Sequence, residues 1–508
     1  MHLRPYQQAA FERVIEGFES FNKQLLVCPT GGGKTVIFSA LAKHYADSGK
    51  RTLILAHRDE LITQAVEKLH SATGIRADRE QAEHYADDSP VIVGSIQTLC
   101  NPKRLERFKR DEFGLVVCDE AHHAISNSWQ RVLNWFDGDA SVLGVTATPD
   151  RGDAKELGSY FENIAYEIQL LELIKQGFLS PIKIKAIPLQ IDVSSVGTSG
   201  GDFDRADLGH AIEPYLSAIA AEIKKHAANR KTLVFCPLIE TSKLFVSKCV
   251  EMGLDARHVD GESPGRAEIL EDFDAGKFHV LSNAMLLTEG YDCPSIDCVC
   301  VLRLTKSRAL YSQMIGRGTR IDDFKSDLLV LDFLWLHETH SLVRPASLVA
   351  VNQREADEMT KLVFERAAGG GGEEDIETLA GTVREQREAK LKAELEANFG
   401  KASKIISADE FAVAAGEIAV AQYEPTMQWE SEPPSESQLK ALRRAKIDPK
   451  TVRGKGHARQ LLNIFFARQK VMPASAKQRA IMRRMGAENW ETATAIEARK
   501  FFAAIRNK

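Results

Sequence analysis

Cysteine is scarce in this chain. Its 508 residues include eight cysteines, none of which forms a CxxC pair and none of which follows Cys300. So few cysteines exclude a disulfide scaffold, and the missing CxxC pairs argue against a zinc ribbon. His337 and His340 form an HxxH pair without cysteine partners. We take them as exposed polar residues rather than metal ligands, so no structural zinc is expected.

Long apolar runs are also missing. No window holds 18 consecutive apolar residues, which excludes a membrane-spanning helix. The first five residues, MHLRP, lack a basic stretch followed by an apolar one, which argues against a secretory signal. We therefore expect a reduced, cytoplasmic protein without membrane contacts.

Negative charge prevails in the chain as a whole, but not at its C-terminal end. The net charge is −5, yet residues 435–508 carry 18 Lys and Arg against 5 Asp and Glu, a balance of +13. The rest of the chain therefore carries −18. A basic segment on an acidic body is typical of a nucleic-acid contact, although a basic surface can also serve only solubility.

Short apolar runs alternate with amphipathic stretches over much of the chain. Each run is separated from the next by enough residues for a crossover helix. This pattern predicts an α/β fold with two parallel-sheet domains, followed by an α-helical C-terminal region. The predicted strands are residues 24–28, 52–56, 91–95, 115–118 and 142–146 in the first sheet, and 232–236, 280–283, 298–302 and 328–332 in the second.

Shifts in composition predict the domain boundaries. The polar, Ser/Gly-rich stretch 192–204 predicts a flexible connection, so the two α/β domains are expected at residues 1–190 and 205–345. Residues 346–434 are expected to form a helical extension. It contains a flexible break at 367–372 and ends in an acidic, Pro-containing linker at 424–437.

The basic segment 435–508 contains an internal repeat with a period of 40 residues. The residues that superpose at this offset include Ser435/Ser475, Gln438/Gln478, Leu442/Met482 and Arg443-Arg444/Arg483-Arg484. Each copy is expected to form two short amphipathic helices, and the two copies together one compact four-helix module. The module is expected to bind nucleic acid or, as the alternative, a protein partner.

Residues 28–35, CPTGGGKT, follow a predicted strand and open a predicted helix. In such a loop, here Thr30 with Gly31, Gly32 and Gly33, backbone N–H groups surround phosphates. Lys34 can then reach the β/γ-phosphates, and the Thr35 hydroxyl can bind Mg²⁺. The P-loop pattern normally begins with Gly where Cys28 stands, and a Gly-rich turn with a chance Lys-Thr pair is the alternative. The strand–loop–helix context favours the P-loop.

A carboxylate pair ends another predicted strand. Residues 115–118 are apolar and lead into Asp119-Glu120-Ala121-His122. Carboxyl ends of parallel strands meet at the ligand-binding edge of a sheet. Asp119 there can hold Mg²⁺ through water, and Glu120 can deprotonate an attacking water. A helix-capping Asp-Glu pair is the alternative; the position at a strand tip favours the site.

With these motifs in this order, the sequence resembles the superfamily 2 helicases with a DEAH box, nearest to the RadD/XPB-like group. The resemblance covers about residues 1–335. Its further segments are LRPYQ 3–7, LAHR 55–58, GSIQT 94–98, TAT 146–148, VFCP 234–237, LTEGYD 287–292 and QMIGRGTR 313–320. It implies two RecA-like domains, ATP and Mg²⁺ as cofactors, and nucleic acid as the partner.

The resemblance also implies a role for each matching residue. Gln7 and Asp292 would contact the nucleotide. The catalytic set would be Lys34, Asp119, Glu120, Gln313, Arg317 and Arg320. Coupling of hydrolysis to strand binding would fall to His122, Thr146 and Thr148. The strand itself would contact His57, Arg58, Ser95, Gln97, Thr98 and Thr288, some of which serve equally well as helix caps. The sequence departs from the commonest family pattern at Ala284 and Met285, so nothing is carried over to them.

These features predict an ATP-dependent DNA helicase or translocase that acts in DNA repair, recombination or replication. An RNA helicase is one alternative, because the core motifs grip the backbone and do not identify the sugar. A non-unwinding clamp that uses ATP as a switch is another, although the full set of hydrolytic residues argues against it. A third is the motor subunit of a defence complex, with a nuclease supplied by a partner.

Overall fold

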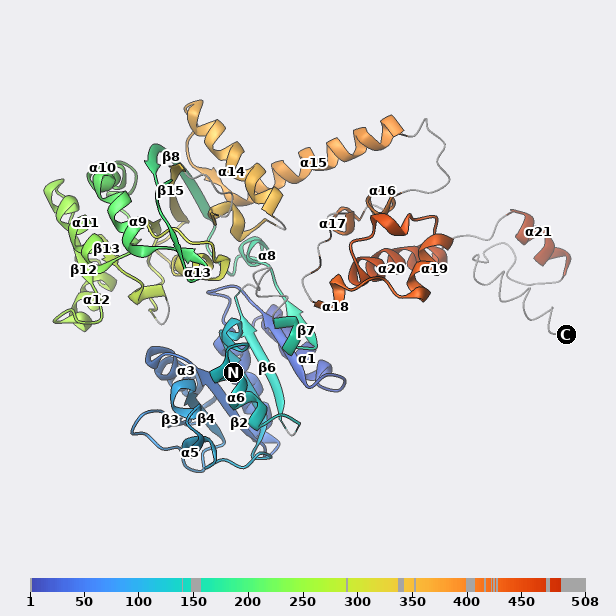
Figure 1. The fold of residues 1–508 in the computed structure, drawn as a ribbon, viewed down its shortest axis with the longest axis horizontal. Coiled ribbons are helices and arrows are strands. Elements are labelled where there is room, and N and C mark those ends of the chain that lie inside the picture. The colour runs from blue at the N-terminus through green and yellow to red at the C-terminus, as the bar shows by residue number, and fades with distance from the viewer. Residues whose placement is uncertain are drawn as a thin grey trace. The chain divides into compact units, whose positions relative to one another are not determined.

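The computed structural model describes most of the chain. The described residues are 2–138, 140–147, 157–288, 291–336, 342–350, 353–398, 407–414, 417–421, 423, 425, 428–471 and 476–485. The chain divides into two compact units, Met1–Arg384 and Glu385–Lys508. The first unit holds both predicted sheets (Figure 1). No helix in these described ranges is both long enough and apolar enough to cross a bilayer.

The first sheet is parallel throughout and has the strand order β3-β4-β2-β5-β6-β1-β7. Runs such as LVVC before Asp119 are apolar on both faces because helices cover both sides of the sheet. Its strands are β1 Lys23–Val27, β2 Arg51–Ala56, β3 Asp78–Glu80, β4 Val91–Ser95, β5 Phe113–Asp119, β6 Ser141–Thr146 and β7 Asn163–Glu167. Its helices are α1 Pro5–Gly17, α2 Lys34–Asp47, α3 Asp59–Thr73, α4 Ile96–Leu99, α5 Pro102–Leu105 and α6 Asn127–Trp135.

The second sheet has the order β12-β13-β11-β14-β15-β8-β16, and only its edge strand β16 is antiparallel. Its strands are β8 Ile182–Asp192, β11 Thr232–Phe235, β12 Ala256–Val259, β13 Val280–Asn283, β14 Cys298–Val301, β15 Leu328–Leu336 and β16 Glu374–Asp375. Its helices are α9 Arg205–Ile212, α10 Leu216–Ala227, α11 Ile239–Glu251, α12 Arg266–Asp274, α13 Arg308–Gly316 and α14 Gln353–Ala368. All the predicted strands are confirmed, and two α/β sheets are present.

The predicted boundary between the two domains is wrong. β8 lies within the range 1–190 assigned to the first domain, yet it pairs with β15 of the second sheet (Figure 1). The connection between the sheets therefore precedes residue 182 and contains the short helix α8 Leu170–Lys175. The strand was missed because its pattern, IKIKAIPLQID, alternates instead of forming a continuous apolar run.

The stretch 192–204 is not a flexible connection. It forms a hairpin of β9 Thr198–Ser199 and β10 Asp202–Phe203, and the Phe203 side chain is buried in the core of the second sheet. The Asp202 carboxylate accepts hydrogen bonds from the Lys306 backbone N–H at 2.8 Å and the Thr305 hydroxyl at 2.9 Å. Its Ser/Gly-rich composition reflects a tight turn that packs on the second sheet.

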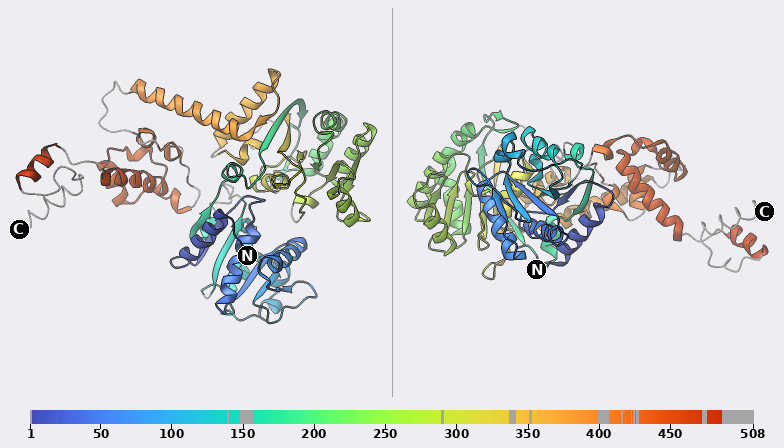
Figure 2. Two further views of the ribbon diagram at one scale, coloured as in Figure 1. Left: turned by 180° about the vertical axis from the view of Figure 1, so that it is seen from behind. Right: turned by 90° about the horizontal axis from the view of Figure 1, so that it is seen from below.

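The expected helical extension 346–434 is divided between the two units. α14 packs along β8 (Figure 2), and the Gly-rich residues 369–372 lead from it into β16, which pairs with β8. The expected break at 367–372 is therefore a turn inside the first unit, closed by the Gly371 N–H donating to the Arg366 carbonyl at 2.8 Å. The long helix α15 Ile376–Asn398 crosses from the first unit to the second.

The second unit includes helices that precede the expected four-helix module 435–508. Its helices are α16 Ala408–Ala414, α17 Ile418–Ala421, α18 Gln428–Ser431, α19 Glu436–Arg444, α20 Lys455–Val471 and α21 Ala476–Arg484. Residues from α16 and α17, such as Ala412 and Val420, share one apolar core with Leu442 and Leu461 of α19 and α20. The second half of the second repeat, residues 486–508, lies outside the described residues.

Residues 428–432 of the expected acidic linker pack against the helices of the second unit. α18 packs on α20, and the Lys455 N–H donates to the Glu432 carbonyl at 2.7 Å. Gly454 has φ +129°, and a Cβ at this position would lie 2.2 Å from the Glu430 carbonyl oxygen. Only glycine permits this approach, so the linker prediction is wrong at residues 428–432.

These contacts predict where the chain can be divided. A chain ending at residue 400 should keep the unfolding midpoint of the first unit within about 2 °C of the full-length value, because its core keeps all its packing partners. A chain ending at 431 keeps α16 to α18 without α19 and α20. It should bind a hydrophobic dye such as ANS strongly. Equal dye binding by the two shortened chains would contradict the shared core.

Candidate functional site

The loop 28–33 joins β1 to α2 at the carboxyl edge of the first sheet. Gly31 and Gly33 have φ +85° and +80°, a left-handed conformation that favours glycine. The Tyr6 hydroxyl donates to the Gly32 carbonyl at 2.7 Å, and the Gln7 side-chain amide donates to the same oxygen at 3.4 Å. Residues of α1 therefore fix the loop, as a phosphate cradle requires.

Gln7, expected to read the base, is buried. Besides its bond to Gly32, its Oε1 accepts the Arg4 backbone N–H at 3.0 Å. A Cβ at Gly33 would lie 2.5 Å from the Gln7 Nε2. In the structure this side chain supports the loop, and its contact with a base stays a prediction.

A buried ion pair joins the two predicted catalytic motifs. The Lys34 Nζ lies 2.8 Å from Glu120 Oε1, and His122 Nδ1 lies 3.5 Å from Glu120 Oε2. Burial raises the pKa of Glu120, but the charges of Lys34 and His122 outweigh it and hold the pKa at about 2. Burial likewise lowers the pKa of Lys34, and Glu120 and Asp119 reverse this, so the pKa is raised. Both groups are ionised at neutral pH.

The backbone at Glu120 is strained. Its φ is +54°, in a region that non-glycine residues rarely adopt, and it directly follows the end of β5 at Asp119. Strain of this kind costs about 1–3 kcal/mol and is found mostly at functional sites. Here it accompanies the placement of the Glu120 carboxylate against Lys34.

Thr35 and Asp119 offer the oxygen ligands that Mg²⁺ prefers, a hydroxyl and a carboxylate. Thr35 lies in the first turn of α2 and Asp119 ends β5, both half-buried at the carboxyl edge of the sheet. Elsewhere in the described part of the chain, no group of three or more His, Cys, Asp or Glu side chains is arranged to hold a metal ion. His337 and His340 lie outside the described residues.

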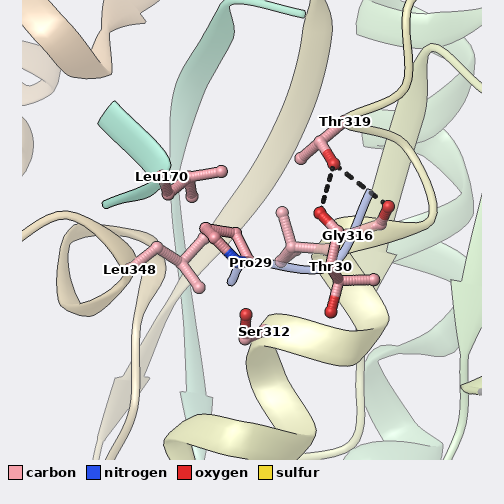
Figure 3. Close-up of a pocket in the computed structure, with 8 residues that line it drawn as sticks. Pro29, Thr30, Leu170, Ser312, Gly316, Thr319 and Leu348 are labelled. Atoms are coloured by element: carbon pink, nitrogen blue, oxygen red, sulfur yellow. Dashed lines mark hydrogen bonds between the residues drawn. The ribbon is translucent and has the colours of Figure 1, made fainter. Parts of the chain in front are cut away.

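The second sheet meets the P-loop directly. A Cβ at Gly316, the last residue of α13, would lie 2.4 Å from the Thr30 Cβ. The Thr319 hydroxyl donates to the Thr30 carbonyl at 3.4 Å and to the Gly316 carbonyl at 3.1 Å (Figure 3). A small hollow at this junction is too narrow for a water molecule. It is lined by Pro29, Thr30, Leu170, Ser312, Ile315, Gly316, Thr319 and Leu348.

Arg320 follows this contact and lies next to the P-loop, since a Cβ at Gly31 would be 3.7 Å from its Cγ. Its guanidinium forms an ion pair with Asp292, and the same carboxylate lies 3.1 Å from the Lys68 Nζ on α3. Burial lowers the pKa of Arg320 to about 10. Burial, and then Arg320 and Arg317, lower the pKa of Lys68. One carboxylate thus joins cations from both sheets.

Arg317 has a different environment. Its guanidinium donates to the Thr288 carbonyl from Nη2 at 2.7 Å and to the Tyr291 carbonyl from Nη1 at 2.7 Å. It therefore holds the loop that leads to Asp292. Gln313, one turn earlier on α13, is buried. The structure brings Lys34, Glu120 and Arg320 to one junction, and the catalytic roles of Arg317 and Gln313 stay predictions.

His122, one of the three expected coupling residues, lies in a chain of ring contacts that leads away from the site. The His122 and His123 rings are 4.1 Å apart between centroids, and His123 and His57 are 4.6 Å apart. His57 follows β2, so these rings connect Glu120 to the next strand tip. Thr146, at the end of β6, is fully buried. Thr148 lies outside the described residues.

Two of the expected strand-binding segments are tied together at the carboxyl edge of the first sheet. The Gln97 amide donates to the His57 carbonyl at 2.5 Å, and the Ser95 hydroxyl donates to Gln97 Oε1 at 2.8 Å. Thr98 Oγ1 accepts the Ala82 N–H at 3.0 Å. Gln97 is exposed, and Arg58, beside His57, is half-buried. Arg58, Gln97 and Thr98 are thus at least partly exposed polar residues suited to phosphate contacts, whereas Ser95 is buried.

Thr288 does not share that exposure. Its side chain is fully buried, and its hydroxyl donates to the Met285 carbonyl at 2.7 Å. This bond ties the hydroxyl to the backbone of its own short helical turn, and contact of Thr288 with a strand stays a prediction. Lys68 is a residue of the site that carried no signal in the sequence. It belongs to an amphipathic helix, and only the fold brings it to Asp292, 224 residues further along the chain.

Two families match the chain. The family described as "Type III restriction enzyme, res subunit" matches residues 1–151, and "Helicase conserved C-terminal domain" matches residues 214–322. The matches cover the first sheet through β6 and strands β11 to β14 of the second sheet. Lys34, Glu120 and Arg320 all fall inside them.

Curated relatives and solved structures agree with these matches. IRC3 of Saccharomyces cerevisiae, named as a candidate ATP-dependent helicase, is 31% identical over 65% of this chain and 51% of its own length. A candidate mitochondrial ATP-dependent helicase, irc3 of Schizosaccharomyces pombe, is 34% identical over 66% of this chain and 57% of its own. The chain thus spans little more than half the length of these relatives.

Among solved structures, a fragment of a candidate HsdR subunit of a type I restriction enzyme from Vibrio vulnificus YJ016 is similar. It has a TM-score of 0.53 and 23% identity, over 66% of this chain and 64% of that one. At this identity the likeness concerns the fold, and it agrees with the two parallel sheets.

Removing one partner of the buried Lys34–Glu120 ion pair should greatly lower the free energy of unfolding. Lys34→Met leaves a buried carboxylate without its counter-ion and should cost about 3–5 kcal/mol in urea unfolding of the unliganded chain. The double variant Lys34→Met/Glu120→Gln should recover most of this. Because the pKa of Glu120 is lowered from 4.5 to about 2, the pair stabilises fully above about pH 4.5 and progressively less as the pH falls toward 2.

Lys43→Met is the matched control, since Lys43 lies on the same helix in an exposed pair with Asp47 at 3.0 Å. It should cost less than about 1 kcal/mol. If Lys34→Met and the double variant lose the same stability, the pair does not act as described.

Proposed function

We propose that the chain, which matches two families of restriction and helicase proteins over its two sheets, is an ATP-dependent DNA helicase or translocase. It would hydrolyse ATP and use the resulting domain motion to move along or remodel nucleic acid. One observation carries the proposal: the P-loop of the first sheet lies directly against Thr319 and Arg320 of the second. Phosphate-binding and charge-neutralising groups from two domains therefore meet at one place.

The residues of this junction suit phosphoryl transfer to water. Backbone N–H groups of residues 31–33 and the N-terminus of α2 would hold the β- and γ-phosphates, for which Lys34 would leave Glu120. Mg²⁺, held by Thr35 and Asp119, would neutralise phosphate charge and orient the γ-phosphate. Glu120, ionised at neutral pH, would then accept a proton from the attacking water.

Arg320 supplies the second half of the site. In the unliganded chain its charge is balanced by Asp292. A γ-phosphate bound at the P-loop would compete with this carboxylate for the guanidinium, and charge developing in the transition state would strengthen the attraction. Since Arg320 belongs to the second sheet, hydrolysis would depend on the two domains being closed.

Closure would be transmitted to the nucleic-acid surface through named contacts. The ring contacts from His122 through His123 to His57 connect Glu120 to the segment bonded to Gln97. A change at the γ-phosphate would thereby reach Ser95, Gln97 and Thr98, which would contact backbone phosphates. We favour DNA because the sequence resembles the RadD/XPB-like group, and RNA is an outcome of the test below.

ATP turnover measured with single-stranded DNA, duplex, fork and matched RNA tests the proposal. Turnover should rise most with a DNA species. Glu120→Gln should still bind ATP but lose about 10²-fold or more in turnover, because a general base is removed while its shape is kept. Greater stimulation by RNA would make the chain an RNA helicase. No turnover with any species, or full turnover in Glu120→Gln, would refute the mechanism.

The position of Arg320 predicts a separation of binding from chemistry. Arg320→Ala should lower turnover by about 10³-fold, as expected for an arginine supplied across a domain junction, and change ATP affinity much less. Titration of a fluorescent ATP analogue and single-turnover hydrolysis measure the two effects. Arg13→Ala, an exposed arginine on α1, is the control. Equal losses in affinity and turnover would show a structural ion pair instead.

A further inference from the structure

The second unit contains the same helix twice. α19 is Glu436–Arg444 and α21 is Ala476–Arg484, so their bounds differ by 40 residues, the period of the sequence repeat. At equivalent positions Leu442 and Met482 are buried, with 0% and 1% exposure. The following arginine pairs, 443–444 and 483–484, are exposed in both copies. The repeat is therefore a repeat of conformation as well as of sequence.

The exposed face of α19 is strongly basic. Lys440, Arg443 and Arg444 are spaced i, i+3 and i+4, which places them on one side of the helix, and all three are exposed. Lys446, also exposed, follows the helix with φ +61°. Four positive charges thus lie on and just beyond the last turns of one short helix.

Three acidic side chains of the second unit interact with residues outside α19. Glu432 lies 3.0 Å from Lys455, the first residue of α20, and Asp409 lies 2.7 Å from Arg453, two residues before that helix. The Asp448 carboxylate accepts the Lys450 backbone N–H at 3.0 Å. The carboxylates of Asp409 and Glu432 therefore pair with Arg453 and Lys455 and not with the basic side chains of α19.

Two simpler roles for the arginine pairs do not explain why both pairs recur. A basic residue in the last turn stabilises a helix through its dipole, but one charge suffices for that. A solubilising face needs no particular residue, whereas two adjacent arginines recur at the same step of each copy. Arginine presents a planar fork that binds two phosphate oxygens at once. A duplicated phosphate site fits a ligand that repeats its phosphates along a chain.

We propose that the arginine pairs 443–444 and 483–484 are two equivalent phosphate-binding sites for one nucleic-acid strand. The proposal rests on the proposed function, because the strand is the one on which the motor acts. The sites bind the backbone without reading sequence, and they lengthen the time for which the chain stays on the strand. They take no part in ATP chemistry.

Binding of full-length chains to a fluorescent single-stranded oligonucleotide, measured over a range of salt concentrations, tests this. Reversing both pairs, R443E/R444E/R483E/R484E, should weaken binding about tenfold or more at low salt. It should also make the slope of log affinity against log salt shallower by ~0.7–0.9 for each phosphate that is no longer bound. Each single pair should give an intermediate effect. Basal ATP turnover should stay unchanged.

Two control variants show whether a loss of binding is specific to the arginine pairs. R354E/K361E reverses two exposed charges on α14, whose side chains are 70% and 77% exposed, and should leave the salt slope unchanged. Glutamine at the four arginine positions avoids placing negative charge at a helix C-terminus and should reduce binding in the same direction. Matching circular dichroism spectra would show that the variants fold.

Wild-type affinity and salt slope in the folded four-arginine variants would overturn the proposal and indicate a protein partner for the module. The outcome is distinct from failure of the proposed function, in which the wild-type chain itself shows no ATP turnover stimulated by nucleic acid.

Discussion

The approach of Gly316 to Thr30 determines how the rest of the site is arranged. A single methyl group at residue 316 would lie 2.4 Å from a Thr30 carbon, so α13 can reach the P-loop only because a glycine ends it. The Thr319 hydroxyl and the Arg320 side chain follow within four residues. Because Gly316 has no side chain, the charged groups that follow it in the second domain lie next to the phosphate loop of the first.

Charge at this junction is balanced before any ligand arrives. Lys34 pairs with Glu120, and Arg320 shares Asp292 with Lys68. An unpaired charge in such buried positions would be costly, and the carboxylates of Glu120 and Asp292 prevent it. A bound phosphate would exchange one set of ion pairs for another. The net gain from binding is therefore smaller than the individual contacts suggest.

Much of the fold and part of the site could be predicted from the sequence. Continuous apolar runs identified the buried parallel strands, because such strands are covered on both faces. The P-loop and the DEAH segment were identified because their residues are adjacent in sequence and end strands at one edge. Lys34, Glu120 and Arg320 do meet at one junction.

The remaining errors have physical causes. β8 is half-buried and alternates Ile with Lys, and nothing in its local sequence indicates which sheet it joins. Residues 428–432 have the composition of an acidic linker, yet Gly454 permits them to pack on α20. Local sequence also does not show whether a polar side chain will hydrogen-bond to a backbone carbonyl of the protein, as the side chains of Thr288 and Gln7 do. These properties depend on contacts between distant segments.

The position of β8 has a consequence for synthesis of the chain. β8 ends at Asp192, and its partner β15 ends at Leu336. At roughly 5–20 residues per second, the ribosome makes β15 about 7–30 s after β8. During that interval β8 lacks its parallel neighbour, because β15 lies between β8 and β14 in the second sheet. The lysines at 183 and 185, which alternate with isoleucines in β8, keep the unpaired strand charged. Charged side chains are one way in which exposed strands avoid pairing with other chains.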